Sequence, residues 1–524
     1  MLKSISLQFS ETPDPIVLPM EGVTIFVGPN NSGKSLVLRE VEMAIAGGVD
    51  FVELKIVKDF EIDWPSESEI KSIISKMELR DPNQSIIDLN LSISFFLSNG
   101  LQTSHLINLQ KLNSIVSEKI DKRLFGNYFL RCVMMKLDGR FRFSLTDERP
   151  GGDLALRAVN ILAHFFRESE LREEVRRIVY DAFNLYFVID PTNLGGLRIR
   201  LSAKAPGKDE QSLNDDAREF HKNALNIKEA SDGVQAYVGM IISVLAGDNK
   251  ILMIDEPEAF LHPPLARKLG VQLSRITSRQ NGCLLASTHS SEFLMGCVQG
   301  APSAIRVVRL EYSGGKSRGR IVDTNALNTM FKDPLMRSAN VVSGLFHDGV
   351  VVTESDNDRA FYAEIYYRLT EQEATLPSVL FINAQNKQTI PRIIESLRQF
   401  GIPAAAIADI DLVKDGGSEF TRWLLAAQIP GGLHTGMAAT RHSLKSCFDQ
   451  SGKNMKTDGG LACLPQQDQD AANDFFDQLE RYGVFTVRRG ELEHWLPNLG
   501  AIGKKTNWTI SALELMGSDP ADDS

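Results

Sequence analysis

Short apolar runs alternate with amphipathic stretches along most of the chain. Residues 23–28 (VTIFVG) form a continuous apolar run that ends in glycine, and residues 35–47 follow with the apolar spacing of a helix. Two more apolar runs, residues 251–255 and 283–288, predict buried strands with a helix between them. This alternation predicts an α/β domain.

The segment between these strands has a different pattern. Residues 105–125 and 153–186 have helical spacing, so we expect an inserted helical region over roughly residues 100–185. Residues 184–203 predict a hairpin around a Gly-Gly loop. The polar residues 205–220 predict a mobile loop.

A second alternation of strands and helices begins near residue 345. Its predicted strands cover residues 349–355, 378–383 and 404–411, with a helix after each of the first two. We therefore expect a separate small parallel sheet. The predicted organisation is a first domain at 1–340, a second at 341–515 and an acidic flexible tail at 516–524.

Composition and charge narrow the functional classes. The net charge of -10 over 524 residues argues against a uniformly basic nucleic-acid-binding surface, but leaves room for a local patch or for bound metal ions. The 5 cysteines show no zinc-binding spacing, and their usage fits a reducing compartment. No apolar stretch is long enough to span a bilayer, and the first residues lack a secretory pattern. We expect a cytoplasmic protein without a membrane partner.

The loop between the first strand and helix fits the nucleotide-binding pattern GxxxxGKS. Its glycines allow backbone N–H groups to turn onto phosphates, and the helix N-terminus adds a positive end. Lys34 is expected to reach the β- and γ-phosphates of ATP, and Ser35 to ligate Mg²⁺. The motif comprises Gly28, Pro29, Asn30, Asn31, Ser32, Gly33, Lys34 and Ser35.

Two later strand ends carry residues suited to the same site. Residues 251–258 (ILMIDEPE) form an apolar strand that ends in two acids. Asp255 would hold Mg²⁺, and Glu256 would orient or deprotonate the attacking water. His289, after the next strand, would contact the γ-phosphate, although a lone histidine is more often structural.

Residues 231–235 (SDGVQ) resemble the LSGGQ signature of ABC ATPases. In that class Ser231 and Gly233 would touch the γ-phosphate of ATP held by a second subunit, which implies a homodimer or a higher even oligomer. The alternative is an ordinary helix N-cap, since Ser followed by Asp-Gly is also good capping chemistry. More than two hundred residues separate Lys34 from Asp255, a gap that ABC and SMC-like ATPases fill with an inserted sheet and helical arm.

Acidic residues recur at strand ends in the second alternation. Glu354 ends one predicted strand and Asp358 begins the next helix, while Asp409 and Asp411 end another strand at positions i and i+2. Residues two apart on a strand point to the same side, so these four carboxylates could converge at one sheet edge. Such oxygens suit Mg²⁺ or Mn²⁺, whereas solvated acids at strand ends are the plainer explanation.

These acids resemble the pattern of a Toprim domain. VVTESDNDRAFY resembles its glutamate element and IADID its DxD element, but Ser355 stands where glycine is usual and residues 382–388 lack the usual glycines. An ABC-type ATPase followed by a Toprim domain is similar to the overcoming-lysogenization-defect (OLD) family of ATP-dependent nucleases. That resemblance implies dimers that cut DNA with divalent metals, often in antiphage defence and sometimes with a partner such as a helicase or a retron.

The resemblance also extends to a late element, residues 484–497. It implies that Glu493, with Glu491 as the neighbouring alternative, adds a ligand for a second metal, and that Lys505 or Lys504 faces the cleaved phosphate. A charged surface loop is the alternative for all four.

Two functions of different classes follow from these motifs. The first is an ATP-gated, divalent-metal DNA endonuclease that acts by two-metal chemistry. The second is an ATP-driven SMC-like scaffold that holds a partner protein or a DNA end, with a degenerate Toprim domain. Topoisomerase or primase chemistry is disfavoured, because no partner domain with a tyrosine nucleophile is visible.

Overall fold

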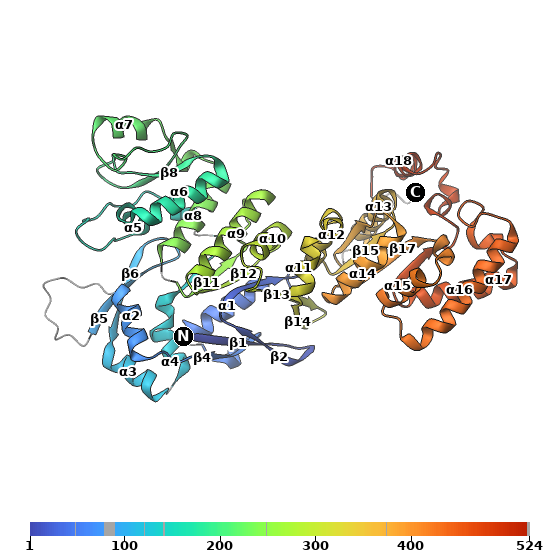
Figure 1. Ribbon diagram of the computed structural model, residues 1–524, viewed down its shortest axis with the longest axis horizontal. Coiled ribbons are helices and arrows are strands. Elements are labelled where there is room, and N and C mark those ends of the chain that lie inside the picture. Colours follow the sequence, from blue (N-terminus) through green and yellow to red (C-terminus); the bar gives the residue numbers. More distant parts are fainter. Residues whose placement is uncertain are drawn as a thin grey trace. The chain divides into compact units, whose positions relative to one another are not determined.

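The computed structural model describes residues 1–47, 49–77, 90–119, 121–139, 142–247, 249–373 and 375–520. The chain divides into two compact units, Met1–Ile321 and Val322–Ser524 (Figure 1). The predicted domain bounds at residues 340 and 515 remain predictions, and residues 521–524 of the predicted tail lie outside the described residues.

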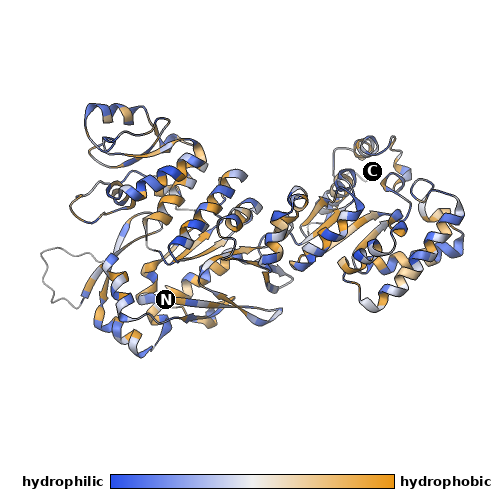
Figure 2. Ribbon diagram, in the orientation of Figure 1, coloured by the Kyte–Doolittle hydropathy of each residue, from blue (hydrophilic) through white to orange (hydrophobic). Residues whose placement is uncertain are grey.

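A six-stranded sheet forms the centre of the first unit. Its strand order is β14-β13-β3-β12-β11-β7, and β13, β3, β12, β11 and β7 run parallel. The bounds are β3 Gly22–Val27, β7 Met134–Leu137, β11 Ile251–Asp255, β12 Cys283–Ser287, β13 Ile305–Ser313 and β14 Lys316–Val322. The inner strands β3, β11 and β12 are mainly hydrophobic (Figure 2), as burial on both faces requires, whereas the edge strand β14 is polar and mostly exposed.

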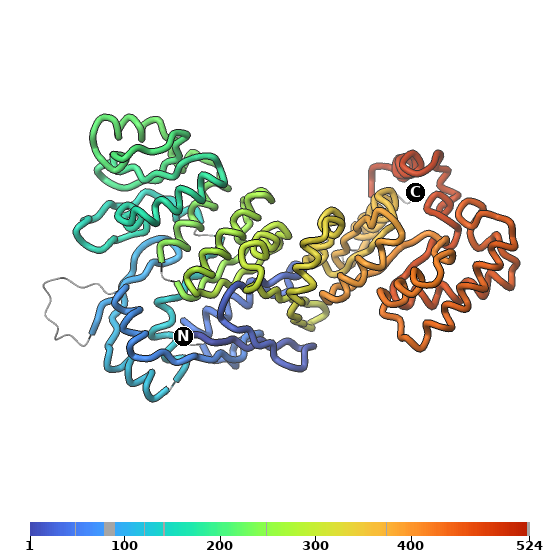
Figure 3. Tube along the Cα trace, viewed as in Figure 1, coloured from blue at the N-terminus to red at the C-terminus, as the bar shows by residue number. Residues whose placement is uncertain are grey.

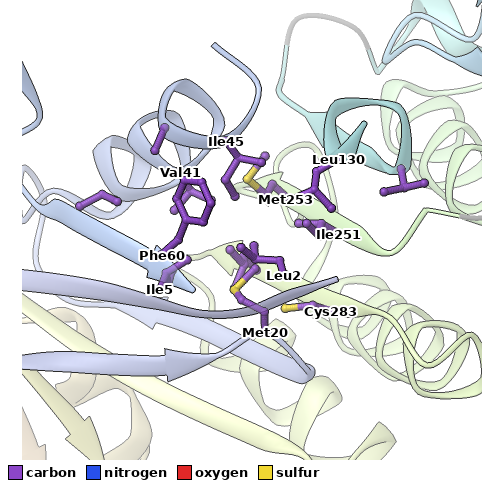
Figure 4. Packing of buried hydrophobic residues seen from close by; sticks show 14 of the residues in the cluster. Leu2, Ile5, Met20, Val41, Ile45, Phe60, Leu130, Ile251, Met253 and Cys283 are labelled. Atoms are coloured by element: carbon purple, nitrogen blue, oxygen red, sulfur yellow. The ribbon is translucent and has the colours of Figure 1, made fainter. Parts of the chain in front are cut away.

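Helix α1 (Lys34–Ile45) packs between this sheet and a second, antiparallel sheet. The second sheet has the order β2-β1-β4, with bounds β1 Leu2–Phe9, β2 Thr12–Pro19 and β4 Val57–Ile62. Figure 4 shows Val41 and Ile45 of α1 beside Phe60 of β4 and Met253 of β11. Because both faces of α1 are packed, its N-terminus is held firmly at the end of β3.

Between β7 and β11 the chain leaves the central sheet and returns through α8 (Asp232–Ala246) (Figure 3). The elements between β7 and α8 are α5 Ile161–Arg167, α6 Ser169–Phe183, β8 Tyr186–Asp190, β9 Arg198–Ser202, α7 Asp215–Lys222 and β10 Leu225–Asn226. A second group lies between β4 and β7, namely α2 Glu67–Met77, β5 Asn90–Phe96, β6 Gln102–Asn108, α3 Leu109–Glu118 and α4 Lys122–Tyr128. The hairpin predicted over 184–203 is confirmed by the antiparallel pairing of β8 with β9.

Three local predictions in this region are wrong. Residues 102–108 form a strand, because they pair with β5, and the helix begins only at Leu109. Residues 153–160 precede the first helix of their segment. Residues 215–220 lie in α7, and the buried Glu210 is ion-paired with Arg172 and Arg176, so the segment 205–220 is tied to α6.

The second unit contains a four-stranded parallel sheet with the order β16-β15-β17-β18. Its strands are β15 Gly349–Thr353, β16 Val379–Asn383, β17 Ala404–Asp409 and β18 Val484–Val487. Its main helices are α11 Thr324–Lys332, α13 Asp356–Gln372, α14 Ile390–Gln399, α15 Ser418–Ala426, α16 Gly431–Ser451, α17 Gln466–Glu480 and α18 Thr506–Leu515. The predicted small parallel sheet is thus confirmed.

One premise about this sheet is wrong. Strand β17 ends at Asp409, and Asp411 lies in the following 3-10 turn, Ile410–Lys414. The two aspartates therefore do not project from one strand as positions i and i+2. Within the described residues, no helix has the length and apolar character needed to cross a bilayer.

Candidate functional site

The loop between β3 and α1 has the backbone that a phosphate cradle requires. Gly28 and Gly33 adopt φ angles of 144° and 96°, and Asn31 adopts 60°. A Cβ on Gly28 would lie 2.1 Å from the carbonyl oxygen of Leu310. Glycine at position 28 is therefore a steric requirement, and the loop can curl over the start of α1.

Lys34 lies inside this loop. Its Nζ donates to the carbonyl oxygens of Gly28 at 2.8 Å and Pro29 at 2.7 Å. Burial lowers the pKa of Lys34 to about 8, and the neighbouring acids Glu256 and Asp255 oppose that shift. The cation is thus held at the centre of the loop, where it can meet the phosphates of a nucleotide.

Asp255 brings the end of β11 to the start of α1. Ser35 Oγ donates to Asp255 Oδ1 at 2.8 Å, and Ser287 Oγ donates to the same oxygen. Ser287 is the register partner of Asp255 on β12. A serine hydroxyl next to an aspartate carboxylate is the donor set that Mg²⁺ takes in such sites, so Ser35 and Asp255 fit this ion.

Glu256, Glu258 and His289 surround the position next to this pair. Glu256 has a left-handed φ of 49°, and its Oε1 lies 3.5 Å from His289 Nε2. The backbone N–H of His289 donates to Glu258 Oε1 at 2.7 Å. Burial raises the pKa of Glu258, whereas burial and the nearby Lys34 lower the pKa of His289. The structure thus brings Glu256 and His289 together, as the sequence predicts, and adds Glu258.

Arg142 is a functional residue that sequence reasoning missed. Its side chain is buried, and its Nη2 donates to the carbonyl oxygens of Asp255 and, at 2.5 Å, of Glu256. It also lies 3.5 Å from the carbonyl oxygen of Ala259. Arg142 therefore fixes the turn that carries both acids, and no local motif marks it.

Replacing Arg142 with methionine is expected to lower the free energy of unfolding by about 3 kcal/mol, because buried carbonyl oxygens lose their donor. Denaturant unfolding measures this, and ATP hydrolysis should fall more than ATP binding. Arg318→Met is the matched control, since Arg318 is exposed, and its effect should stay within about 0.5 kcal/mol. Equal stability of the two variants would contradict the role of Arg142.

Ser231 is the N-cap of α8, yet its side chain makes no capping hydrogen bond. Both Ser231 and Asp232 are exposed. A Cβ on Gly233 would lie 2.7 Å from the carbonyl oxygen of Phe260, so this glycine lets α8 approach the turn after β11. The capping alternative is therefore not realised by the Ser231 hydroxyl.

The acidic residues of the second unit gather at the carboxyl edge of its sheet. Glu354 follows β15, and Asp358 begins α13 in a reciprocal capping box with Ser355, whose N–H donates to Asp358 Oδ2 at 2.9 Å. Burial and Asp409 raise the pKa of Glu354 to about 7. Burial, Asp409 and Glu493 raise the pKa of Asp358 to about 6. These mutual effects place Glu354, Asp358, Asp409 and Glu493 in one electrostatic neighbourhood.

Two lysines that sequence reasoning missed face these acids. Lys456 Nζ lies 2.5 Å from Asp409 Oδ2 and 3.9 Å from Asp411 Oδ2. Lys387 Nζ lies 3.1 Å from both Asp411 Oδ1 and Asp415 Oδ1. Asp411 is thus paired chiefly with Lys387, and Asp409 is paired with Lys456.

The late element contributes Glu493 and Glu491. Burial and Glu493 raise the pKa of Glu491, and Asp409 adds to this shift. The backbone N–H of Lys505 donates to Glu493 Oε1 at 2.8 Å. Lys505 is therefore a positioning residue through its backbone, and among the described residues neither its ammonium group nor that of Lys504 forms an ion pair with the acids.

Carboxylate oxygens are the ligands that Mg²⁺ and Mn²⁺ prefer, so this group of acids has the right chemistry for a divalent cation. Glu354 Oε2 is buried and has no hydrogen-bond partner among the described residues. Lys456 already supplies a positive charge at Asp409. As they stand, no three His, Cys, Asp or Glu side chains of the described ranges are arranged as a finished metal site. A cation would therefore have to displace Lys456 and draw the acids together.

Metal binding at this edge is expected to be coupled to protons. Because the native pKa values of Glu354 and Asp358 lie above the ordinary 4.5 and 3.8, the metal-free native chain holds more protons than the unfolded chain between about pH 4 and 7. Its stability should fall as pH rises through this window. Mn²⁺ affinity should rise between pH 6 and 7 by up to about tenfold for each proton displaced.

Thermal unfolding with and without Mn²⁺, from pH 5 to 8, measures both effects. Glu354→Gln should weaken the pH dependence, whereas Glu395→Gln on α14 serves as the matched control. A Mn²⁺ stabilisation that is the same at pH 6 and pH 8 would contradict the coupling.

Comparisons with known proteins find a matching family model within each of the two compact units. Residues 143–295 match the AAA_21 family ("AAA domain, putative AbiEii toxin, Type IV TA system"), and residues 345–411 match the Toprim domain of overcoming-lysogenization-defect-like proteins. The chain is 23% identical over 330 residues to the Old nuclease of Escherichia phage P2, which covers 60% of this chain and 54% of that protein. The chain thus spans about half the length of this curated relative.

The solved structures that are similar to this chain include two SMC head domains. One, bound to the C-winged helix domain of ScpA, is 12% identical over 62% of this chain and 99% of its own, with a TM-score of 0.36. The SMC head domain from Thermotoga maritima is 14% identical over 62% of this chain and 99% of its own, with a TM-score of 0.31. The ABC-type α/β fold rests on the strand order and loop geometry described above.

Proposed function

We propose that this chain, an ATPase–Toprim protein with the domain pair of the OLD family, is a divalent-metal-dependent DNA endonuclease controlled by ATP. The observation that carries the proposal is the group of half-buried acids around Asp409, at the carboxyl edge of a parallel sheet in a matched Toprim domain. The similarity to the Old nuclease supports it.

In this proposal Glu354, Asp358, Asp409 and Glu493 hold Mg²⁺ or Mn²⁺, with Asp411 as a further candidate ligand. Bound metal ions would stabilise the attacking and leaving oxygens of a phosphodiester displacement. The protein's own part is to orient Asp358 through Ser355 and Glu493 through the Lys505 N–H, and to hold the half-buried carboxylates at one sheet edge.

ATP acts in the first unit. Lys34 and the loop at 28–35 bind the phosphates, Ser35 and Asp255 hold Mg²⁺, Glu256 orients or deprotonates the water, and His289 contacts the γ-phosphate. The uncapped, exposed Ser231 supports a site completed by a second copy of the chain. The proposed assembly is therefore a homodimer or a higher even oligomer in the cytoplasm, acting in antiphage defence with or without a further partner.

Cleavage of supercoiled plasmid by the full chain tests the nuclease. Nicked or linear product is expected with Mg²⁺ or Mn²⁺ and not with a chelator, and added ATP should change the rate. Cutting that persists in the chelator would reject metal dependence.

One observation favours a second function, the SMC-like scaffold with an inactive Toprim domain. Lys387 lies in residues 382–388, the element that lacks the usual glycines, and its ammonium group forms an ion pair with the Asp411 carboxylate. If this pair does not open, the site would lose one ligand. Normal ATP hydrolysis without any DNA cutting, under all metals, would support the scaffold.

A further inference from the structure

A cavity of about 750 Å³ lies beside β18 in the second unit. Its volume is within the range of ligand pockets, and its lining combines an aromatic ring, two guanidinium groups and a hydroxyl. The lining residues that matter here are Thr486, Arg488, Arg489, Trp495 and Asn498, and we call this cavity the β18 groove.

Trp495 provides a fixed aromatic surface in the groove. Its ring meets Tyr362 at 5.5 Å and Phe361 at 6.0 Å, both in edge-on geometry. These two residues lie on α13, about one turn after Asp358. The ring packs against Phe361 and Tyr362, and 38% of Trp495 remains exposed. A braced and partly open indole of this kind suits stacking with a planar group, because little side-chain entropy remains to be lost.

Within the part of the chain that the structure describes, Thr486 Oγ1 has no hydrogen-bond partner and Arg489 forms no ion pair. Thr486 is only 8% exposed, and its Oγ1 has no hydrogen-bond partner among the described residues. That oxygen itself has almost no accessible surface, so Thr486 contributes to the floor of the groove and not to its exposed polar groups. Arg489 is exposed and makes no ion pair within the described part of the chain, whereas Arg488 is already bound to Asp477 and Glu480.

The groove adjoins the acidic site. Val487 of β18 is the register partner of Asp409, and the N–H of Ile410 donates to the carbonyl oxygen of Gly490 at 3.1 Å. Glu491 and Glu493 lie on the segment between Arg489 and Trp495. Arg489 and Trp495 therefore flank the late acidic element, one before it and one after it.

We infer that the β18 groove binds an unpaired nucleotide of a single-stranded DNA segment next to the acidic site. A base would stack on Trp495, and its phosphate would meet the exposed Arg489. Stacking on an aromatic ring beside a cationic group is how proteins hold single strands without reading their sequence. This inference rests on the proposed nuclease function and names the form of DNA that the site receives.

Anisotropy of a fluorescein-labelled dT12 oligonucleotide, with the full chain in chelator so that no cutting occurs, tests the inference. Trp495→Ala should weaken binding by about five- to a hundredfold, and Trp495→Phe should restore most of it. Arg489→Ala should lower the slope of log affinity against log salt by about 0.7. Tyr367→Ala is the matched control, since Tyr367 is an exposed aromatic residue outside the groove, and it should bind as the native chain does.

Quenching of Trp495 fluorescence by dT12 gives a second readout, which Trp495→Phe should remove. Unchanged dT12 binding by Trp495→Ala would overturn the inference and would leave a protein segment as the occupant to consider. Tighter binding of an oligo-U RNA than of dT12 would overturn the assignment to DNA. If the native chain shows no metal-dependent cutting but binds dT12 in a way that depends on Trp495, the nuclease proposal is rejected and the inference about the β18 groove stands.

Discussion

Replacing Glu256 with glutamine is expected to slow ATP hydrolysis by about 10²–10⁴-fold, because the side chain keeps its size and loses the ability to accept a proton. The turn that holds Glu256 is fixed by Arg142, and its carboxylate lies 3.5 Å from His289. Lys34 and the loop at residues 28–35, the proposed phosphate contacts, are unchanged in this variant. ATP affinity should therefore stay near that of the native chain.

The same variant tests the assembly. If Ser231 and Gly233 complete the site of a second chain, a variant that binds ATP without hydrolysing it should accumulate as the ATP-bound dimer. Phosphate release and light scattering after size exclusion, with and without ATP, measure the two effects. Glu170→Gln, at an exposed position of α6, is the control. Hydrolysis within a few-fold of the native rate would contradict the role of Glu256.

Replacing Asp409 with asparagine is expected to reduce the rate of DNA cutting at least about a hundredfold. Even the loss of a residue that only hydrogen-bonds a metal ligand lowers metal affinity or activity by about 10–100-fold. Asp409 raises the pKa of both Glu354 and Asp358, so its charge acts at the centre of the acidic group. ATP hydrolysis should be unchanged, since the variant leaves the first unit intact.

Lys456→Met provides the contrasting variant. Lys456 competes with a metal ion for Asp409, so its removal should tighten Mn²⁺ binding whereas Asp409→Asn should weaken it. Calorimetric titration of Mn²⁺ measures both. The control is Asp449→Asn, at an exposed position of α16. Equal Mn²⁺ affinity in all three variants would contradict a metal site at Asp409.

The nucleotide-binding loop was predictable because its determinants are local. Gly28, Gly33 and Lys34 act through the backbone of a single loop, and the apolar runs at β11 and β12 are buried on both sides. The small parallel sheet was predictable for the same reason. Three of its strands, β15, β16 and β17, are short, apolar and followed by a recognisable helix or turn, whereas the four-residue β18 was not predicted.

The residues that escaped prediction act over long sequence distances. Arg142 reaches Glu256 across 114 residues, and Lys456 meets Asp409 from a loop after α16. No spacing rule connects such pairs, since only the tertiary fold brings them together. Asp411 was misplaced because β17 ends two residues earlier than the apolar pattern suggests. Residues 105–108 were misassigned because pairing with β5 outweighs their helical spacing.

The most direct measurement of the central claim is a time course of supercoiled-plasmid cutting, with Mn²⁺ and ATP, by the native chain and by Asp409→Asn purified in parallel. The account predicts that the native chain cuts, that Asp409→Asn does not, and that both hydrolyse ATP at the same rate. Equal cutting by the two proteins would show that the acidic edge around Asp409 is not the nuclease site.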